Sequence, residues 1–134
     1  MIALDTNVLI YACDKADPIR QQIALDLISN TTDAVILWQV ACEFVAASRK
    51  LERQGFTASD AWARLGEFLA ACPLVIPAGS AVLDRAKSLH LTHKVSFWDA
   101  MILAACLHSG AHLLYSEDVP GGDVGGVSVV NPFK

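Results

Sequence analysis

The feature that most constrains this fold is a series of short, continuous apolar runs, separated by segments that have the length and charge mix of helices. Runs of this kind, with one or two helices between them, are typical of strands buried on both faces of a parallel sheet. The runs cover residues 1–4, 34–38, 73–76, 112–116 and 127–130. We therefore predict a three-layer α/β/α fold whose central parallel sheet has four to five strands and right-handed crossovers.

Helices are expected in the segments between these runs. Pro18 suits the first turn of a helix, where its missing N–H is not needed. Thr57 and Asp60 have the spacing of a capping box at the start of another helix. The glycine-rich segment "VPGGDVGG" is predicted to be a loop before the last strand. The expected helices cover residues 7–13, 18–29, 39–54, 57–72, 80–90 and 97–109.

Length and composition are those of a small domain with a large core. The 134 residues predict a single domain, 1–134, and 54% of them are hydrophobic, with a mean hydropathy of +0.41. No apolar run reaches the ~18 residues of a membrane span, and no basic segment precedes the first apolar run. We expect a cytoplasmic protein with no membrane contact.

The acidic net charge of the chain does not exclude nucleic acid as a substrate. A formal net charge of −4 and a pI near 5.4 lack the overall basic character of many nucleic-acid binders. Acidic residues gathered in one pocket would account for much of this imbalance, and a metal ion would neutralise them there. The composition therefore leaves a nucleic-acid enzyme open.

Two aspartates follow predicted strands directly. Asp5 ends the first strand, and Asp118 lies two residues beyond "LLYS" at the end of the fourth. Because parallel strands end at the same edge of a sheet, where sites form, these carboxylates are expected to converge. Each also has a simpler interpretation: Asp5 as the cap of the following helix, and Asp118 as part of an acidic turn.

Asp99 and Glu43 are open to two interpretations each. "SFWD" fits a capping box in which Ser96 caps a helix and Asp99 reaches back to its first amides, yet that position also suits a metal ligand. Glu43 shares a helical face with Gln39 and Lys50, as expected of a solvated surface. Position alone does not decide between these interpretations.

Four blocks in register resemble the PIN domain, and more narrowly the small ribonuclease toxins of the VapC type. The blocks are "LDTNVLI", "WQVACEFVAASRK", "VSFWDAMILAACLHSGA" and "LLYSEDV", which together extend over essentially the whole chain. The resemblance implies an acidic cluster of Asp5, Glu43, Asp99 and Asp118, with Ser116 as the small hydroxyl residue two positions before the last acid. Glu117 is a possible substitute for Asp118 in this cluster.

The resemblance also implies an activity and partners. Oxygen-only ligands suit Mg²⁺ or Mn²⁺, and the implied reaction is metal-dependent endonucleolytic hydrolysis of RNA phosphodiesters. Asp5 and Asp99 are expected to contact the metal directly, with Glu43 and Asp118 completing a second site or activating the water. A homodimer and an inhibitory antitoxin protein are the implied protein partners.

RNA contacts are expected from a basic helix end and from tryptophans. Arg49, Lys50 and Arg53 are candidates for phosphate contacts, although ordinary surface charge explains them equally well. Further candidates with the same alternative are Arg64, Arg85, Lys87 and Lys94. Trp38 and Trp98 are expected to pack in the core beside the site, although stacking on bases is the alternative.

Two other functions fit parts of the sequence. Phosphatases of the haloacid dehalogenase type also place an aspartate after a first strand, but they need a second aspartate at the position that Asn7 occupies here. A non-catalytic PIN-fold module that binds RNA or protein is the second alternative, and the complete acidic set argues against it.

Overall fold

A computed structural model describes residues 1–134 and has a six-stranded sheet at its centre. The strands are β1 (Ile2–Leu4), β2 (Ala34–Leu37), β3 (Leu74–Val75), β4 (Leu113–Tyr115), β5 (Gly122–Val124) and β6 (Val127–Val130). Their order across the sheet is β3-β2-β1-β4-β6-β5, and every neighbouring pair is parallel except β5 and β6. The predicted parallel sheet is confirmed.

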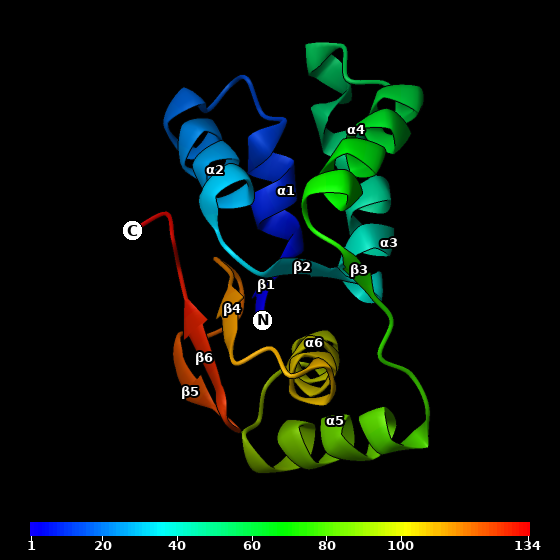
Figure 1. Ribbon diagram of the computed structural model, residues 1–134, viewed down its shortest axis with the longest axis vertical. Helices are drawn as coiled ribbons and strands as arrows, with labels where there is room; N and C mark the ends of the chain where they lie inside the picture. Colours follow the sequence, from blue (N-terminus) through cyan, green and yellow to red (C-terminus); the bar gives the residue numbers. More distant parts are fainter.

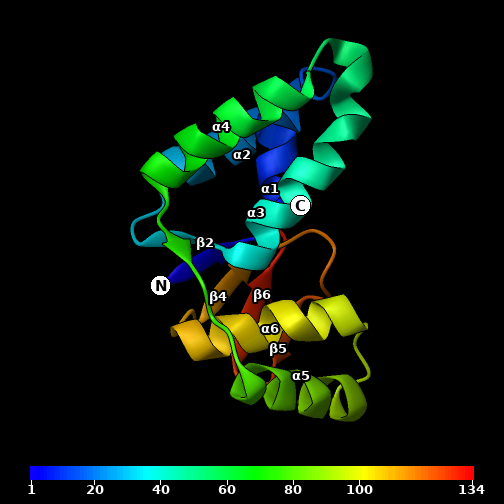
Figure 2. The same cartoon turned by 90° about the vertical axis from the view of Figure 1, so that its right-hand side faces the viewer.

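Helices cover both faces of this sheet, which gives the predicted three layers. One layer contains α1 to α4 and the other contains α5 and α6, as Figures 1 and 2 show. The helices are α1 (Thr6–Ala12), α2 (Pro18–Asn30), α3 (Trp38–Ala47), α4 (Ala58–Ala71), α5 (Ser80–Thr92) and α6 (Phe97–Ser109). A 3₁₀-helix, η1 (Ser48–Gln54), continues α3. No helix is long and apolar enough to span a membrane.

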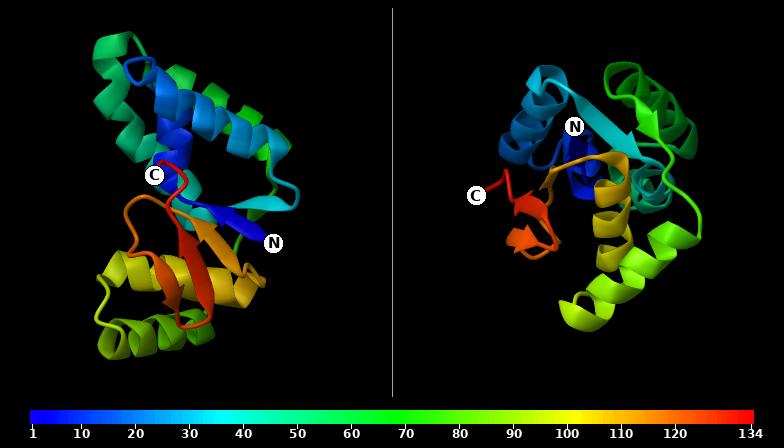
Figure 3. Two further views of the ribbon diagram at one scale, coloured as in Figure 1. Left: turned by 90° about the vertical axis from the view of Figure 1, so that its left-hand side faces the viewer. Right: turned by 60° about the horizontal axis from the view of Figure 1, so that its bottom comes forward.

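Strand β5 was not predicted, because its residues lie in the glycine-rich segment that we expected to be a loop. It pairs antiparallel with β6 at the sheet edge (Figure 3). Gly125 and Gly126 form the two-residue turn between them, with φ of 62° and 100°. A two-residue hairpin loop with positive φ at both positions matches the twist of the flanking strands and favours Gly-Gly. The hairpin, rather than an apolar run, therefore creates this strand.

Local sequence explains most helix boundaries. The Thr57 hydroxyl accepts the amide of Asp60 while the Asp60 carboxylate accepts the amide of Thr57, so the predicted capping box is formed. The predicted helix over 39–54 is instead α3 followed by η1, which ends at Gly55 with φ of 80°. Trp38, placed at the end of a strand by its hydropathy, begins α3.

Strand β2 and helix α6 contribute continuous runs of buried residues to the core. All four residues of β2 are buried, and α6 buries a continuous series from Ile102 to Cys106. Phe44 on α3 is completely buried and meets the Phe68 ring of α4 edge-on, with centroids 5.5 Å apart. Aromatic pairs in this geometry add to the stabilisation from area burial. The same helix carries Glu43, so core packing fixes where that acid lies.

Replacing Phe44 by Ala should destabilise the fold strongly. We expect a loss of about 3–5 kcal/mol in the free energy of unfolding, because the substitution leaves a cavity and removes a full aromatic side chain. Urea denaturation followed by circular dichroism measures the change. Phe97→Ala is the matched control, since Phe97 is 48% exposed. Equal losses in the two variants would contradict this account of the core.

Candidate functional site

Asp5 lies at the carboxyl edge of the sheet, where β1 and β4 end side by side. Its carboxylate is only 7% exposed and accepts two hydrogen bonds of 2.7 Å, from the Thr6 amide to Oδ1 and from the Ser116 hydroxyl to Oδ2. The first is the predicted helix cap of α1. The second joins the ends of the two strands. Asp5 is therefore both a cap and the centre of a buried polar site.

Two residues of α1 connect Asp5 to further acids. The Thr6 hydroxyl donates to Oε2 of Glu43 at 2.9 Å, and the Asn7 side-chain amide donates to Oδ2 of Asp118 at 3.2 Å. Glu43 comes from α3, and Asp118 from the bend that follows β4. The structure thus brings together three of the four predicted acids through two short polar side chains. The interpretation of Glu43 as ordinary solvated surface is wrong, since Glu43 is half-buried and bonded through both carboxylate oxygens.

Ser116 fixes the bend that carries Asp118. While its hydroxyl donates to Asp5, its oxygen accepts the backbone amides of Asp118 at 3.1 Å and Val119 at 3.0 Å. Ser116 is 1% exposed, so these bonds do not compete with bulk water. A small hydroxyl residue is needed at this position because one group must donate to the Asp5 carboxylate and also accept the two backbone amides of the bend.

Asp99 is the acid that the structure leaves apart from this network. It lies in the first turn of α6, where its backbone amide donates to the Ser96 hydroxyl at 3.2 Å. Its carboxylate does not return a bond to Ser96, so the predicted capping box is only half formed. The Asp99 carboxylate makes no hydrogen bond or ion pair, and it is not among the charges that act on Asp5.

Glu117 and Asp118 have different surroundings. The Glu117 carboxylate accepts a 2.7 Å hydrogen bond from the Tyr11 hydroxyl and lies 3.7 Å from Nε of Arg20. The hydrogen bond to Glu117, together with burial, raises the pKa of Tyr11 to about 12, so Tyr11 stays a donor at neutral pH. The Asn7 side-chain amide donates to the carboxylate of Asp118 and not to that of Glu117. The structure therefore favours Asp118 as the fourth acid.

Burial and neighbouring charge make Asp5 unusually basic. Desolvation raises its pKa from 3.8 to about 6, the bonds from Ser116 and Thr6 oppose the shift, and the charges of Glu43 and Asp118 add to it. A carboxylate under these conditions binds either a proton or a cation more readily than an exposed one. Asp5 is thus the most strongly perturbed acid of the site.

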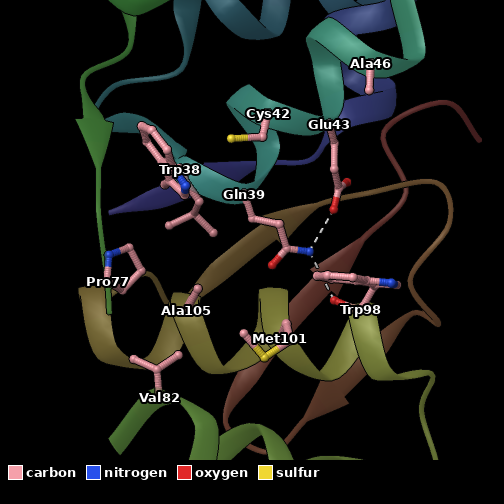
Figure 4. A pocket seen from close by; sticks show the side chains of 11 residues that line it. Trp38, Gln39, Cys42, Glu43, Ala46, Pro77, Val82, Trp98, Met101 and Ala105 are labelled. Atoms are coloured by element: carbon pink, nitrogen blue, oxygen red, sulfur yellow. Dashed lines mark hydrogen bonds between the residues drawn. The ribbon is translucent and has the colours of Figure 1, made fainter. Parts of the chain in front are cut away.

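Gln39 is a site residue that sequence reasoning did not single out. Its side-chain amide donates to Oε1 of Glu43 at 2.8 Å and to the backbone carbonyl of Trp98 at 3.3 Å. It thereby links Glu43 to Trp98 at the beginning of α6, as Figure 4 shows. The only signal in the sequence was the i,i+4 spacing of Gln39 and Glu43, which suits a helical side-chain pair.

An apolar groove of about 740 Å³ adjoins the acids at Glu43. Trp38 and Trp98 line it and are 53% and 63% exposed, so the expectation that they pack in the core is wrong. Pro77, Val82 and Met101 are among its other lining residues (Figure 4). Hydropathy does not distinguish an aromatic ring that faces the core from one that faces a groove.

Lys50 is a cation that lines the same pockets as Asp118. Two further pockets of about 520 and 340 Å³ open beside the site, and Lys50, Asn7 and Asp118 line both of them. Lys50 is exposed and forms no ion pair, whereas Arg20 and Arg64 do. Its ammonium group is therefore free to meet an anion that enters beside Asp118.

The donor set suits a hard divalent cation. No three Asp, Glu, His or Cys side chains are arranged closely enough to enclose a metal ion. Mg²⁺ does not require such a cage, because it keeps several waters and binds through one or two carboxylates. The desolvated Asp5 carboxylate, with like charges on Glu43 and Asp118 beside it, is the kind of oxygen ligand that such an ion stabilises.

The chain belongs to the PIN domain family, whose model matches residues 2–119. A search of curated protein sequences found no match. Among solved structures, the fold is similar to a chain in the crystal structure of VapBC2 from Rickettsia felis bound to a DNA fragment from their promoter. That comparison has 17% sequence identity and a TM-score of 0.71, and covers 98% of each chain. The predicted PIN fold is confirmed.

The raised pKa of Asp5 should make the stability of the metal-free protein depend on pH. Because the folded pKa of about 6 exceeds the ordinary 3.8, the protonated carboxyl favours the folded state. This contribution is complete below the ordinary pKa and is lost as pH rises through the folded pKa. For a shift of this size the loss is at most about 3 kcal/mol.

We expect Asp5→Asn to abolish this loss. Urea denaturation in EDTA, compared between about pH 4 and pH 8, measures it. Asp26→Asn is the matched control, because Asp26 is exposed and only accepts a bond from Gln22. If the free energy of unfolding depends on pH in the same way in Asp5→Asn and in the wild type, the raised pKa of Asp5 is contradicted.

Proposed function

We propose that this protein is a Mg²⁺- or Mn²⁺-dependent endoribonuclease and the toxin of a type II toxin–antitoxin pair of the VapC type. Membership of the PIN family supports nuclease chemistry. The similarity to a chain of a VapBC2 structure supports the narrower class, since that assembly is a VapB–VapC complex.

One observation carries this proposal: the buried Asp5 carboxylate, connected to Glu43 through Thr6 and placed beside Asp118 through Ser116 and Asn7. Such an arrangement has no evident structural purpose, because helix α1 needs only one cap. Burying a carboxylate among like charges costs folding free energy unless hydrogen bonds or a cation compensate. A perturbed acid with further carboxylates beside it at one strand edge is typical of a functional site.

The acids divide into two roles in the proposed reaction. Asp5 and Asp99 would hold the cation, which would supply Lewis acidity toward the scissile phosphate. The role of Asp99 rests on the family resemblance, and its carboxylate makes no hydrogen bond that would compete with a cation. Glu43 and Asp118 would complete a second cation site, or orient the attacking water and accept the proton that it loses. Thr6 and Asn7 keep these two acids oriented.

Lys50 compensates for the acidic surroundings when RNA binds. It lines the pockets that meet at Asn7 and Asp118, so a phosphate beside the scissile bond lies within reach of its ammonium group. Phosphate contacts of this kind position the strand without reading its sequence. Lys50 thereby offsets the repulsion that a net charge of −4 imposes on a polyanion.

The proposed protein partners are an antitoxin and a second copy of the chain. An arginine from an antitoxin would pair well with the carboxylates around Asp5, and this is the route of inhibition that we propose. We also propose that the protein forms a homodimer and is located in the cytoplasm. A tight complex whose inhibitor stays away from Asp5 and Asp99 would contradict the inhibitory contact.

Asp5→Asn should abolish RNA cleavage while leaving the fold intact, because an amide removes the charge that binds the cation. Cleavage of a mixed RNA pool with Mg²⁺, with and without EDTA, measures the activity, and circular dichroism measures the fold. Asp26→Asn is again the control and should cleave normally. A wild-type protein that binds RNA without cutting it would instead favour a binding module.

Lys50→Ala should weaken RNA binding while changing the turnover number little. Losing one phosphate contact is expected to reduce the slope of log affinity against log salt by about 0.7 for a single strand. KM and kcat measured over a range of salt concentrations test this. Lys87→Ala on α5 is the control, since Lys87 is exposed on the other helical layer. Identical salt slopes for all three proteins would remove Lys50 from the site.

A further inference from the structure

Glu117 is held by a compact set of side chains that the proposed chemistry does not use. The Tyr11 hydroxyl donates to one carboxylate oxygen at 2.7 Å, and Nε of Arg20 lies 3.7 Å from the other. Arg20 also pairs with Asp17 at 3.0 Å, and its guanidinium lies over the Tyr11 ring, 5.6 Å from the centroid. The Tyr11 ring packs against Phe133, with centroids 4.7 Å apart. We call Tyr11, Arg20 and Glu117 the brace.

The brace is anchored to elements that are distant in sequence. Tyr11 lies in α1, Arg20 in α2, and Glu117 in the bend after β4. Nε of Arg20 is buried without a hydrogen-bond partner, so its attraction to Glu117 is not shared with water. The Arg20 side chain as a whole is 43% exposed, so this ion pair adds modestly to the shorter Tyr11 hydrogen bond. The brace therefore resists displacement of Glu117.

The backbone of the same bend is fixed by Asn7. The side-chain oxygen Oδ1 of Asn7 accepts the backbone amide of Glu117 at 3.3 Å. The side-chain nitrogen Nδ2 of Asn7 donates to the Asp118 carboxylate at 3.2 Å. The bend is thus held at its backbone by Asn7 and Ser116 and at its side chain by the brace. Asp118 is exposed, and without these restraints nothing else in the protein would orient it.

We propose that Glu117 is a positioning residue, and that the brace holds the bend so that Asp118 faces the other acids. The inference rests on the proposed function, in which Asp118 contributes to the acidic site. It assigns the two neighbouring acids different roles. Asp118 lines both pockets beside the site, whereas Glu117 lines only the smaller one and its carboxylate is held by Tyr11 and Arg20. Groups that orient metal ligands in this way affect metal affinity and activity as strongly as some ligands do.

Three variants test the brace. Tyr11→Phe removes only the hydroxyl and keeps the ring against Phe133. Glu117→Ala removes the whole anchor, and Glu117→Gln keeps an oxygen that accepts from Tyr11. The matched controls are Tyr115→Phe, since the Tyr115 hydroxyl makes no hydrogen bond, and Glu67→Ala, which breaks the exposed 2.7 Å ion pair with Arg64.

Hydrogen exchange of the Asp118 and Val119 amides reads the bend directly, without requiring metal or RNA. Tyr11→Phe and Glu117→Ala should accelerate exchange by about fivefold or more, the factor for one lost hydrogen bond. Glu117→Gln should remain closer to the wild type, and both controls should match it. Wild-type exchange rates in Tyr11→Phe and Glu117→Ala would overturn the brace, even if their melting temperatures fall.

Mn²⁺ titration and RNA kinetics then connect the bend to the site. Tyr11→Phe and Glu117→Ala should weaken Mn²⁺ binding and lower kcat by about 10-fold, with KM for RNA little changed. If Glu117→Ala weakens Mn²⁺ binding while Tyr11→Phe does not, Glu117 is itself a ligand and the positioning role is wrong. A wild-type protein that neither binds Mn²⁺ nor cleaves RNA refutes the proposed function, while the exchange rates still decide the brace.

Discussion

The hydrogen bond from the Ser116 hydroxyl to the buried Asp5 carboxylate is the interaction on which the site depends. It joins the ends of two neighbouring parallel strands, and the other acids are placed relative to it. An ionised carboxylate with little solvent access is stable only when strong donors replace its water, and Ser116 and the Thr6 amide fill that role. The order of the strands in the sheet thus determines which acids lie next to one another.

Short polar side chains separate the acids as well as connect them. Thr6 and Gln39 each donate to Glu43, and Asn7 donates to Asp118, so each carboxylate has a donor of its own. Carboxylates in direct contact would share a proton instead, and one of them would be neutral. Donors that stabilise each charge individually keep the negative potential of the site high, which attracts a cation.

Parallel topology and apolar runs could be predicted from the sequence, because they reflect burial on both faces of the sheet. The convergence of Asp5 and Asp118 followed from the same topology. Strand β5 escaped prediction because a hairpin with two positive-φ glycines creates it. Long-range partners explain the other errors: Glu43 appeared solvated until Thr6, 37 positions away, was seen to bond to it.

The sequence also could not decide which of the adjacent acids, Glu117 or Asp118, belongs to the site. The choice between Glu117 and Asp118 depends on which way a bend turns, and Asn7 and Tyr11, more than 100 positions away, set that direction. The half-formed cap at Ser96 shows a similar limit. Spacing allows a reciprocal pair there, but only the packing of α6 decides whether the Asp99 carboxylate turns back.

Both margins of the sheet are poor templates for a strand from another molecule. β3 has only two residues and follows Pro73, while β5 is a three-residue strand that contains Gly122 and an exposed Asp123. Short outer strands with proline nearby or a charge discourage backbone pairing between molecules. Edge-to-edge, amyloid-like pairing between copies of this chain is therefore disfavoured at both margins, and the proposed homodimer would need another surface.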